Sequence, residues 1–278
     1  MTAATTTITT WNVNSVRIRL DGIAALIEAH DPDLLCLQET KVVNDSFPLD
    51  AFEALGYRHS IIAGMKSYNG VAILSRLPFA DSGVRDWCGK ADCRHVWATL
   101  ENGVEVNNFY VPAGGDVPDV ALNDKFAHKL RFLAEMINWF AARSAPANKL
   151  VLVGDLNVAP LETDVWSHKA LLKVVSHTPI EVEALDALKA SHRWIDTARI
   201  FTPPEETLYS WWSYRARDWE TADRGRRLDH IWVTPALEDA VQSVDTLRPA
   251  RGWERPSDHV PVTDRKSTRL NSSHTSIS

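Results

Sequence analysis

Runs of aliphatic residues, closed by polar turn formers, mark the strands of this chain. Residues 150–153, Leu-Val-Leu-Val, do not alternate with polar residues, which is typical of a strand buried on both faces. Gly154, Asp155 and Asn157 follow this run and indicate a turn. Similar runs, continuous or alternating, predict further strands over residues 6–11, 34–37, 71–75, 95–100, 104–110 and 230–233.

At least two amphipathic helices lie between these strands. Apolar residues recur at helical spacing in one segment near the N-terminus and in another near the middle of the chain. Their apolar faces carry Leu20, Ile23, Ala24 and Ile27 in the first helix, and Phe126, Leu130, Leu133, Ile137 and Phe140 in the second. The mixture predicts an α/β fold with helices packed outside the sheets. Because no repeat or low-complexity linker interrupts it, we expect residues 1–262 to form a single domain.

Residues 263–278 (TDRKSTRLNSSHTSIS) differ in composition from the rest of the chain. They are rich in Ser, Thr, Arg and Asn, lack an apolar period, and begin where residues 259–262 (HVPV) resemble the opening of a strand. We interpret this segment as a disordered, non-native tail, for example vector or read-through sequence. The last strand is then expected to be shortened.

Composition and charge narrow the class of protein. With 278 residues, 45% of them hydrophobic, the chain can bury a large core, and its apolar runs of four to six residues are far shorter than the roughly 20 that a membrane helix needs. Residues 1–10 lack the charged and apolar regions of a secretion signal, so we expect a soluble protein that is not exported. A net charge of −6 gives no overall attraction to nucleic acid, so such binding requires a local basic patch.

The three cysteines, Cys36, Cys88 and Cys93, are odd in number and lack CxxC spacing. They argue against a disulfide framework and against a zinc site. A reducing cytoplasm is therefore the expected compartment.

Polar residues collect where three of the predicted strands end. Asn12 and Asn14 follow the first strand, Gln38 and Glu39 the second, and Asp155 and Asn157 the run at 150–153. If these strands share one sheet and point the same way, the polar groups gather at one edge, where open sheets bind ligands. Taken alone, each is more often a turn former. Two later segments, RRLDHIWV and RPSDHVPV, add Asp229, Asp258 and His259, so a turn-forming role must explain five separate clusters.

Seven ordered motifs resemble those of the exonuclease III family of DNA-repair enzymes, within the endonuclease/exonuclease/phosphatase superfamily. They are TWNVNSVR, LCLQETK, YNGVAILSR, NFYVPAGG, GDLNVAP, RRLDHIW and PSDHVPV. Each motif alone is weak, but the ordered set is highly specific and spans residues 6–262. The resemblance implies a four-layered α/β/β/α sandwich, with two mixed β-sheets packed face to face and flanked by helices. It also implies Mg²⁺-dependent phosphodiester hydrolysis on DNA, with Mn²⁺ as a substitute ion.

The resemblance further implies the roles of individual residues. Glu39 matches the metal-binding glutamate, with Asp258 as a second carboxylate near the ion, and Mg²⁺ commonly takes only one or two protein carboxylates. Asp155 matches the aspartate that orients or deprotonates the attacking water, and Asn157 and Asn12 are neutral donors to phosphate or water. His259 would contact the phosphate with Asp229 hydrogen-bonded to its ring, and Tyr110 matches a tyrosine assigned to the phosphate or the leaving group.

Residues 209–227 (YSWWSYRARDWETADRGRR) combine arginines with aromatic residues. Arginines bind phosphates while aromatic rings stack on bases. By resemblance, Trp211 would line the pocket for an extrahelical abasic sugar, and we expect Arg215 and Arg226 to bind the DNA. Acidic residues nearly cancel the charge of the segment, so a structural, salt-bridged loop is the alternative.

Two positions depart from the family pattern. Asn14 stands where some relatives carry an aspartate, so a second metal site is not implied for this chain. Ala113 follows "YVP" where relatives often have an Asn or Gln that contacts phosphate. That donor is either missing here or supplied by another residue.

The favoured function is a Mg²⁺-dependent DNA-repair phosphodiesterase. It would cleave 5′ to abasic sites and also act as a 3′-to-5′ exonuclease and a 3′-phosphatase or phosphodiesterase. Double-stranded DNA with abasic sites or 3′ blocks is the expected partner of a monomeric, cytoplasmic, nucleoid-associated protein of bacterial type. The alternatives are a phosphoinositide- or sphingolipid-type phosphoesterase of the same superfamily and a non-catalytic DNA-binding protein.

Overall fold

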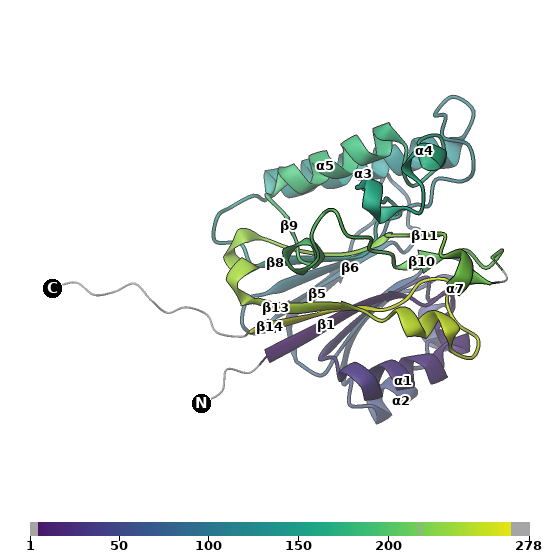
Figure 1. Cartoon of the computed structure of the whole chain (residues 1–278). Helices are drawn as coiled ribbons and strands as arrows, with labels where there is room; N and C mark the ends of the chain where they lie inside the picture. Colours follow the sequence, from purple (N-terminus) through teal and green to yellow (C-terminus); the bar gives the residue numbers. More distant parts are fainter. Residues whose placement is uncertain (1–4, 217, 268–278) are drawn as a thin grey trace.

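The computed structural model of the chain describes residues 5–216 and 218–267 and shows the four-layered sandwich that the family resemblance implies. Two six-stranded sheets face each other, with α1 and α2 outside one of them and α3 and α5 outside the other (Figure 1). The helices are α1 (Leu20–His30), α2 (Leu49–Ala54), α3 (Asp124–Ala142), α4 (His168–Leu171), α5 (Pro179–Ser191), α6 (Ala198–Phe201) and α7 (Trp219–Ala222).

Each sheet has one parallel pair of strands at its centre. The first sheet has the order β13 (Val241–Thr246), β14 (Val262–Ser267), β1 (Thr5–Asn12), β2 (Leu34–Gln38), β4 (Val71–Ser75) and β3 (His59–Ala63). The second has the order β5 (Phe79–Val84), β6 (His95–Leu100), β7 (Glu105–Tyr110), β8 (Leu150–Asp155), β12 (Asp229–Val233) and β9 (Ile195–Asp196). The pairs β1/β2 and β7/β8 are parallel and the other pairs are antiparallel. A small separate ribbon joins β10 (Trp211–Trp212) to β11 (Gly225–Arg226).

Strand β8 shows how the layers are held together. All of its residues are buried, as its unbroken aliphatic run predicts. Val151 and Val153 pack into the core between the sheets. Leu150 and Leu152 pack on the opposite face, in the cluster that contains side chains of α3 and α5. Burial of such a side chain contributes about 1.5–3 kcal/mol, so the strand is anchored from both sides.

The strand registers bring the polar residues of the sequence motifs to one end of the sandwich. Asp155 lies opposite Tyr110 on β7 and opposite Asp229 on β12, while Asn12 lies opposite Gln38 on β2. These residues belong to two sheets, and β1 contacts β8 across the sandwich. The expectation that they share the edge of one sheet is therefore wrong. They meet where the ends of two facing sheets come together.

The seven predicted strands and both predicted helices are present. Two further strands, β5 and β13, are not predicted because they lack an uninterrupted apolar run. The residues of β5 and of β13 are all exposed or only partly buried, as befits a strand at the edge of its sheet. Helix α5 also escaped prediction, although Thr178, Pro179 and Glu181 form a recognisable helix start.

The disorder predicted for the tail is wrong for its first five residues, 263–267. They continue β14, which pairs with both β1 and β13. Thr263 and Asp264 are buried, and the Thr263 hydroxyl is 2.8 Å from that of Thr9. Backbone pairing on both sides therefore outweighs the polar composition. The remainder of the proposed tail, residues 268–278, lies outside the described residues, and its foreign origin stays a prediction.

Candidate active site

Two carboxylates are joined through one amide at the centre of the site. The Asn12 side chain, at the end of β1, donates one hydrogen bond of 2.9 Å to Glu39 and another of 2.9 Å to Asp155. Asn12 is fully buried, and its oxygen accepts from the backbone N–H of Asn14 at 3.1 Å. Both amide hydrogens are thus used to hold the carboxylates together. The expected donation from Asn12 to phosphate or water is not available in this arrangement.

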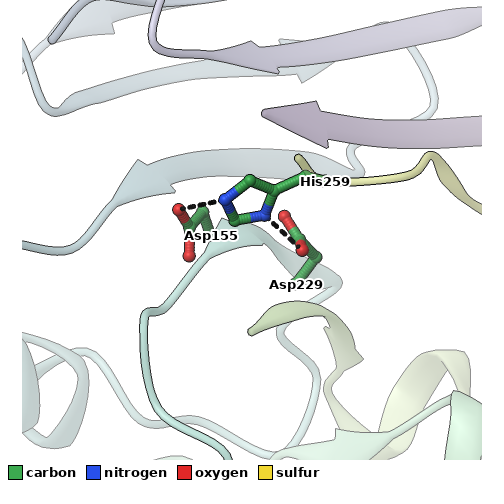
Figure 2. Close-up of side chains that lie close together, drawn as sticks. All are labelled: Asp155, Asp229 and His259. Carbon is green, nitrogen blue, oxygen red and sulfur yellow. Dashed lines mark hydrogen bonds and ion pairs between the residues drawn. The ribbon is translucent and has the colours of Figure 1, made fainter. Parts of the chain in front are cut away.

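A histidine lies between two aspartates next to this amide (Figure 2). His259 Nδ1 donates a 2.8 Å hydrogen bond to Asp229 Oδ2, as expected, and its Nε2 is 3.7 Å from Asp155 Oδ2. The second distance is that of an ion pair and exceeds a hydrogen bond. Burial opposes the charge of His259, but Asp229 and Asp155 outweigh burial and raise its pKa to about 10. The ring is therefore cationic at neutral pH.

Asp155 is buried and has a perturbed carboxyl group. Burial raises its pKa to about 7, an effect that His259 opposes and Asp229 reinforces. Asp155 Oδ1 accepts a 3.0 Å hydrogen bond from the backbone N–H of Asn157. A carboxylate that titrates near neutral pH is well matched to accept a proton. An ordinary aspartate, with a pKa near 4, is a much weaker base.

Tyr110 and Asn157 complete the group of polar side chains. The Tyr110 hydroxyl donates a 2.9 Å hydrogen bond to Glu39 Oε1, and burial together with the charges of Glu39 and Asp155 raises its pKa well above the ordinary value. It therefore stays a neutral O–H donor. Asn157 donates to the carbonyl of Val111 at 2.9 Å and adopts a left-handed backbone with φ of 54°.

Glu39 has the properties of a metal ligand. Burial opposes its ionisation, but the charge of Lys41 and hydrogen bonds from Asn12 and Lys41 keep its pKa below the ordinary value. The Lys41 ammonium lies 2.7 Å from Glu39 Oε2 and 2.5 Å from Asn14 Oδ1, so a cationic group already lies between these two oxygens. Ionised carboxylate and amide oxygens suit hard divalent cations. The residues present therefore fit a metal ion at Glu39.

Asp258, expected as a second carboxylate near the ion, is linked to Glu39 through Asn14 and Lys41. Its two oxygens accept hydrogen bonds from Asn14 at 3.2 Å and from the indole of Trp211 at 3.0 Å. Asn14 in turn contacts Lys41, which connects Asp258 to Glu39 indirectly. The amide at position 14 thus links two acidic residues without adding charge.

Asp155, Asp229 and His259 offer ligand atoms within 4.8 Å of one another. That spacing alone is compatible with a metal ion. However, a ligating imidazole must lose its proton, and both aspartates raise the pKa of His259. We therefore regard this cluster as a histidine held by a hydrogen bond to Asp229 and an ion pair with Asp155, and we take Glu39 as the candidate metal ligand.

The arginine- and tryptophan-rich segment is divided between structural and exposed residues. Arg227 is buried and pairs with Asp196 at 2.5 Å, in accord with the salt-bridged alternative. Trp211 packs against an apolar cluster, and its ring lies 5.2 Å from the Arg226 guanidinium. Arg226 donates to Val175 and Ser176 and makes no ion pair in the described part of the chain, and Arg215 is exposed.

Two residues of the site were not identified from the sequence. Lys41 lies within the quoted motif LCLQETK, and its spacing of two from Glu39 was an available signal. Ser210 donates to Asp229 at 2.6 Å and accepts from the N–H groups of Leu228 and Asp229. No local pattern distinguishes this serine. Ala113, the second departure from the family pattern, has an exposed side chain and cannot supply the missing donor.

Comparison with known proteins agrees with this geometry. Residues 9–259 match the Endonuclease/Exonuclease/phosphatase family. Exodeoxyribonuclease III of Haemophilus influenzae is 30% identical over 91% of this chain and 96% of its own. An AP endonuclease from Archaeoglobus fulgidus has a TM-score of 0.85 at 32% identity, covering 93% of this chain and 98% of that one.

A further solved structure, a 3′ phosphatase from Neisseria bound to a product DNA hairpin, also has a TM-score of 0.85. It is 34% identical and covers 93% of this chain and 98% of its own. Family match, whole-length similarity and fold therefore agree. The chain belongs to the endonuclease/exonuclease/phosphatase family of hydrolases, in its exonuclease III branch.

Proposed function

We propose that the protein is a Mg²⁺-dependent DNA-repair nuclease that cleaves the phosphodiester 5′ to an abasic site. We propose that the same site removes 3′ phosphates and 3′ nucleotides. The observation that carries this proposal is the convergence of Glu39, Asp155 and His259 from distant parts of the chain at one end of the sandwich. Whole-length relatives named as an exodeoxyribonuclease, an AP endonuclease and a 3′ phosphatase support DNA as the substrate.

In the proposed reaction, Asp155 orients the attacking water and accepts its proton. Its raised pKa suits that role near neutral pH, because a base is most effective when its pKa lies near the working pH. Asn12 holds Asp155 beside Glu39. Asn157 fixes the second oxygen of Asp155 through its backbone N–H. The water-activating carboxylate is thus oriented before substrate binds.

His259 and Tyr110 supply donors for the charge that develops on the phosphate and the departing oxygen. The cationic His259 keeps its Nδ1 on Asp229, and its Nε2 is free to donate to a phosphoryl oxygen because it makes only a 3.7 Å contact with Asp155. Tyr110 keeps its proton and donates an O–H. Donors aimed at developing charge commonly contribute several kcal/mol to rate acceleration.

Glu39 would hold the Mg²⁺ ion, with Asp258 close by. When bound, such an ion neutralises negative charge on the phosphoryl group and lowers the pKa of coordinated water. Few protein ligands are expected, since Mg²⁺ keeps several waters and phosphate oxygens in its shell. Mn²⁺ shares the preference for oxygen ligands and would substitute.

The proposed DNA contacts lie beside Trp211. Its partly buried ring is held against the buried cluster of Ala159, Val165, Leu171 and Leu228, which fixes the indole that would line the pocket for a sugar without its base. Arg226, which stacks on that ring and donates to Ser176 and to the carbonyl of Val175, is suited to bind phosphate. Arg215 is exposed nearby in the same segment. Together they would supply the local positive charge that the whole molecule lacks.

The decisive experiment is incision of a duplex that carries one abasic site, with Mg²⁺ and then with chelator. We expect Mg²⁺-dependent cleavage 5′ to the lesion, and a loss of about 10²- to 10⁴-fold in Asp155→Asn. Inositol phosphates and a sphingolipid serve as competing substrates. Faster hydrolysis of either would favour the lipid-directed members of the superfamily, and DNA binding without any hydrolysis would favour a non-catalytic role.

We also propose that the protein acts as a monomer in the cytoplasm, in association with the nucleoid. Among the described residues, none of the helices is both long and apolar enough to cross a membrane. The bacterial relative of nearly full-length similarity supports a bacterial type of enzyme. Size-exclusion chromatography with light scattering would test the monomer.

A further inference from the structure

A lysine and a glutamate form an ion pair deep in the layer between the second sheet and its helices. Lys129 lies on the inner face of α3 beside Phe126 and Phe132, and Glu181 lies in the first turn of α5. Both side chains are fully buried and hydrogen-bonded to each other. A charge in such surroundings requires hydrogen-bonding partners, because an unpaired buried ion is strongly unfavourable.

The remaining partners of Lys129 are backbone carbonyls of the two loops that lead away from the active site. Its Nζ donates to the carbonyl of Asn157 at 2.8 Å and to that of Ala113 at 3.4 Å. The first loop follows Asp155, the last residue of β8, and carries Asn157, and the second follows Tyr110, the last residue of β7. One ammonium group therefore ties both loops to the same helix.

Close packing limits where this ammonium can lie. A Cβ at Gly114 would lie 2.9 Å from Lys129 Cδ, so the loop after β7 runs directly over the lysine stem. Glu181 is fixed as well, because it accepts from Ser176 N, Thr178 N and the Thr178 hydroxyl. The Lys129–Glu181 ion pair is therefore held in one position, unlike an ion pair on the protein surface.

Asn157 is held through both its backbone N–H and its carbonyl in a left-handed conformation. Its N–H donates to Asp155, its carbonyl accepts from Lys129, and its φ of 54° is in the left-handed region. If the lysine contact is lost, the backbone of Asn157 is held less firmly even though its side chain still donates to Val111, and the Asp155 carboxylate loses a fixed partner. The orientation of Asp155 then becomes variable.

We infer that the Lys129–Glu181 pair is a positioning unit for Asp155 and Asn157, acting on the chemical step rather than on DNA affinity. The expected effect on kcat rests on the proposed function. The expected effect on the backbone of Asn157 rests on geometry alone. Lys129 is fully buried, and it donates to Glu181 and to the carbonyls of Asn157 and Ala113. Its effect travels through the Asn157 carbonyl.

The test compares Lys129→Met with the double variant Lys129→Met/Glu181→Gln, which removes both charges and retains a capping oxygen at position 181. Replacing a buried ion pair by uncharged residues often leaves stability intact, so the double variant is expected to fold. Phe140→Leu is the matched control, since Phe140 is a buried residue in the last turn of the same helix, far along α3 from Lys129. Lys129→Arg is the conservative variant.

We expect kcat for abasic-site incision to fall by about 10- to 100-fold in both Lys129→Met variants, because an error of about 1 Å in placement has effects of that size. KM should stay within about threefold of the value for the unmodified protein, because the ion pair is not expected to contribute to substrate binding. Lys129→Arg should recover part of the loss, and Phe140→Leu should keep kcat. A folded double variant with wild-type kcat, or an equal loss in Phe140→Leu, would overturn the inference.

Amide hydrogen exchange of residues 155–159 gives a readout that does not need activity. Exchange of the Asn157 N–H should accelerate at least tenfold in the Lys129→Met variants and remain unchanged in Phe140→Leu. If the unmodified protein fails to incise DNA, the proposed function fails while the exchange data still decide the positioning role. Unchanged exchange in a folded Lys129→Met variant would refute that role.

Discussion

His259 is shared by two aspartates whose surroundings assign them different tasks. Asp229 accepts from both Ser210 and His259, so its Oδ2 serves to orient and charge the ring. Asp155 accepts from Asn12 and from the backbone of Asn157 and has only an ion-pair contact with the histidine. Because the first aspartate holds the histidine, the second remains available to water. In the proposed mechanism, two chemically identical groups would thus perform separate functions.

Substitution of Asp229 by Asn tests this division. The amide cannot neutralise a cationic imidazole, so the pKa of His259 should fall and the phosphate should lose a charged donor. We expect kcat to drop by about 10²-fold at neutral pH, which is within the range for loss of general acid–base catalysis. Single-turnover incision of abasic DNA would measure it. Ser210→Ala, which removes only one hydrogen bond to Asp229, should have a clearly smaller effect, and equal losses would contradict the assignment.

Substitution of Trp211 is expected to separate two of the proposed DNA activities, abasic-site incision and removal of 3′ phosphates. An abasic sugar would rest on its ring, whereas a 3′ phosphate leaves that surface empty. Trp211→Ala should therefore reduce abasic-site incision about tenfold or more, in line with about 1–3 kcal/mol for a stacking contact, while 3′-phosphate removal changes less. Trp166→Ala is the matched control, since Trp166 is an exposed indole that also stacks with an arginine, Arg224. Parallel losses in both assays would contradict a sugar-binding role.

At the scale of elements, strand β14 is the clearest case in which local composition gives the wrong prediction. Its residues resemble a disordered tail, yet the strand fills the space between β13 and β1. Strand β1 ends in Asn12, which holds the two carboxylates. Removing β14 exposes the edge of the strand that carries this asparagine. The C-terminal strand therefore supports the active site indirectly.

Two truncations test the contribution of β14. Ending the chain after Ser267 keeps every backbone pair of the strand, and we expect full activity and unchanged stability. Ending the chain after Val262 removes the strand pairing of residues such as Thr263 and Asp264 with β1 and β13. Nothing replaces these backbone contacts. Unfolding in urea should show a lower midpoint for the shorter protein, together with reduced incision. Identical midpoints for the two proteins would show that β14 is dispensable.

Local periodicity predicts a strand correctly where all of its residues are buried, and it fails where the residues are exposed or only partly buried. The run at 150–153 is buried on both faces, so its pattern needs no knowledge of neighbouring strands. β5 and β13, by contrast, gain their order from pairing with β6 and β14. The residue types of the site were also readable from the motifs. The contact between Asn12 and Asp155 spans 143 residues and two sheets, which no local pattern contains.

At the scale of the whole molecule, two buried histidines couple the fold to pH. Burial lowers the pKa of His95 and of His230 to about 3. His95 stacks on Phe109 with ring centroids 3.9 Å apart and bonds to Asn107. Both are therefore neutral in the native protein. In the unfolded chain their pKa values return to about 6.5.

At these two histidines the unfolded state consequently binds more protons than the native state between about pH 6.5 and pH 3, whereas Asp155, with its pKa raised to about 7, contributes in the opposite direction. Stability is fully present above the unfolded pKa and falls as pH is lowered through this window, by about 1.4 kcal/mol per pH unit for each histidine. His95→Phe removes one of the two. It should lower the free energy of unfolding at pH 7, because the buried Asn107 oxygen loses its bond to His95, and it should flatten the decline between pH 6.5 and pH 5.

Urea unfolding at pH 7, 6 and 5 measures the slope of the free energy of unfolding against pH. The measurements stay at or above pH 5 because most carboxylates bind protons below that pH. Val96→Ala is the control, since Val96 is a buried neighbour of His95 on β6 without a titratable group. It should reduce stability equally at each pH and leave the slope unchanged. A His95→Phe slope equal to that of the unmodified protein would mean that His95 is already protonated in the fold, in conflict with its stacking and burial.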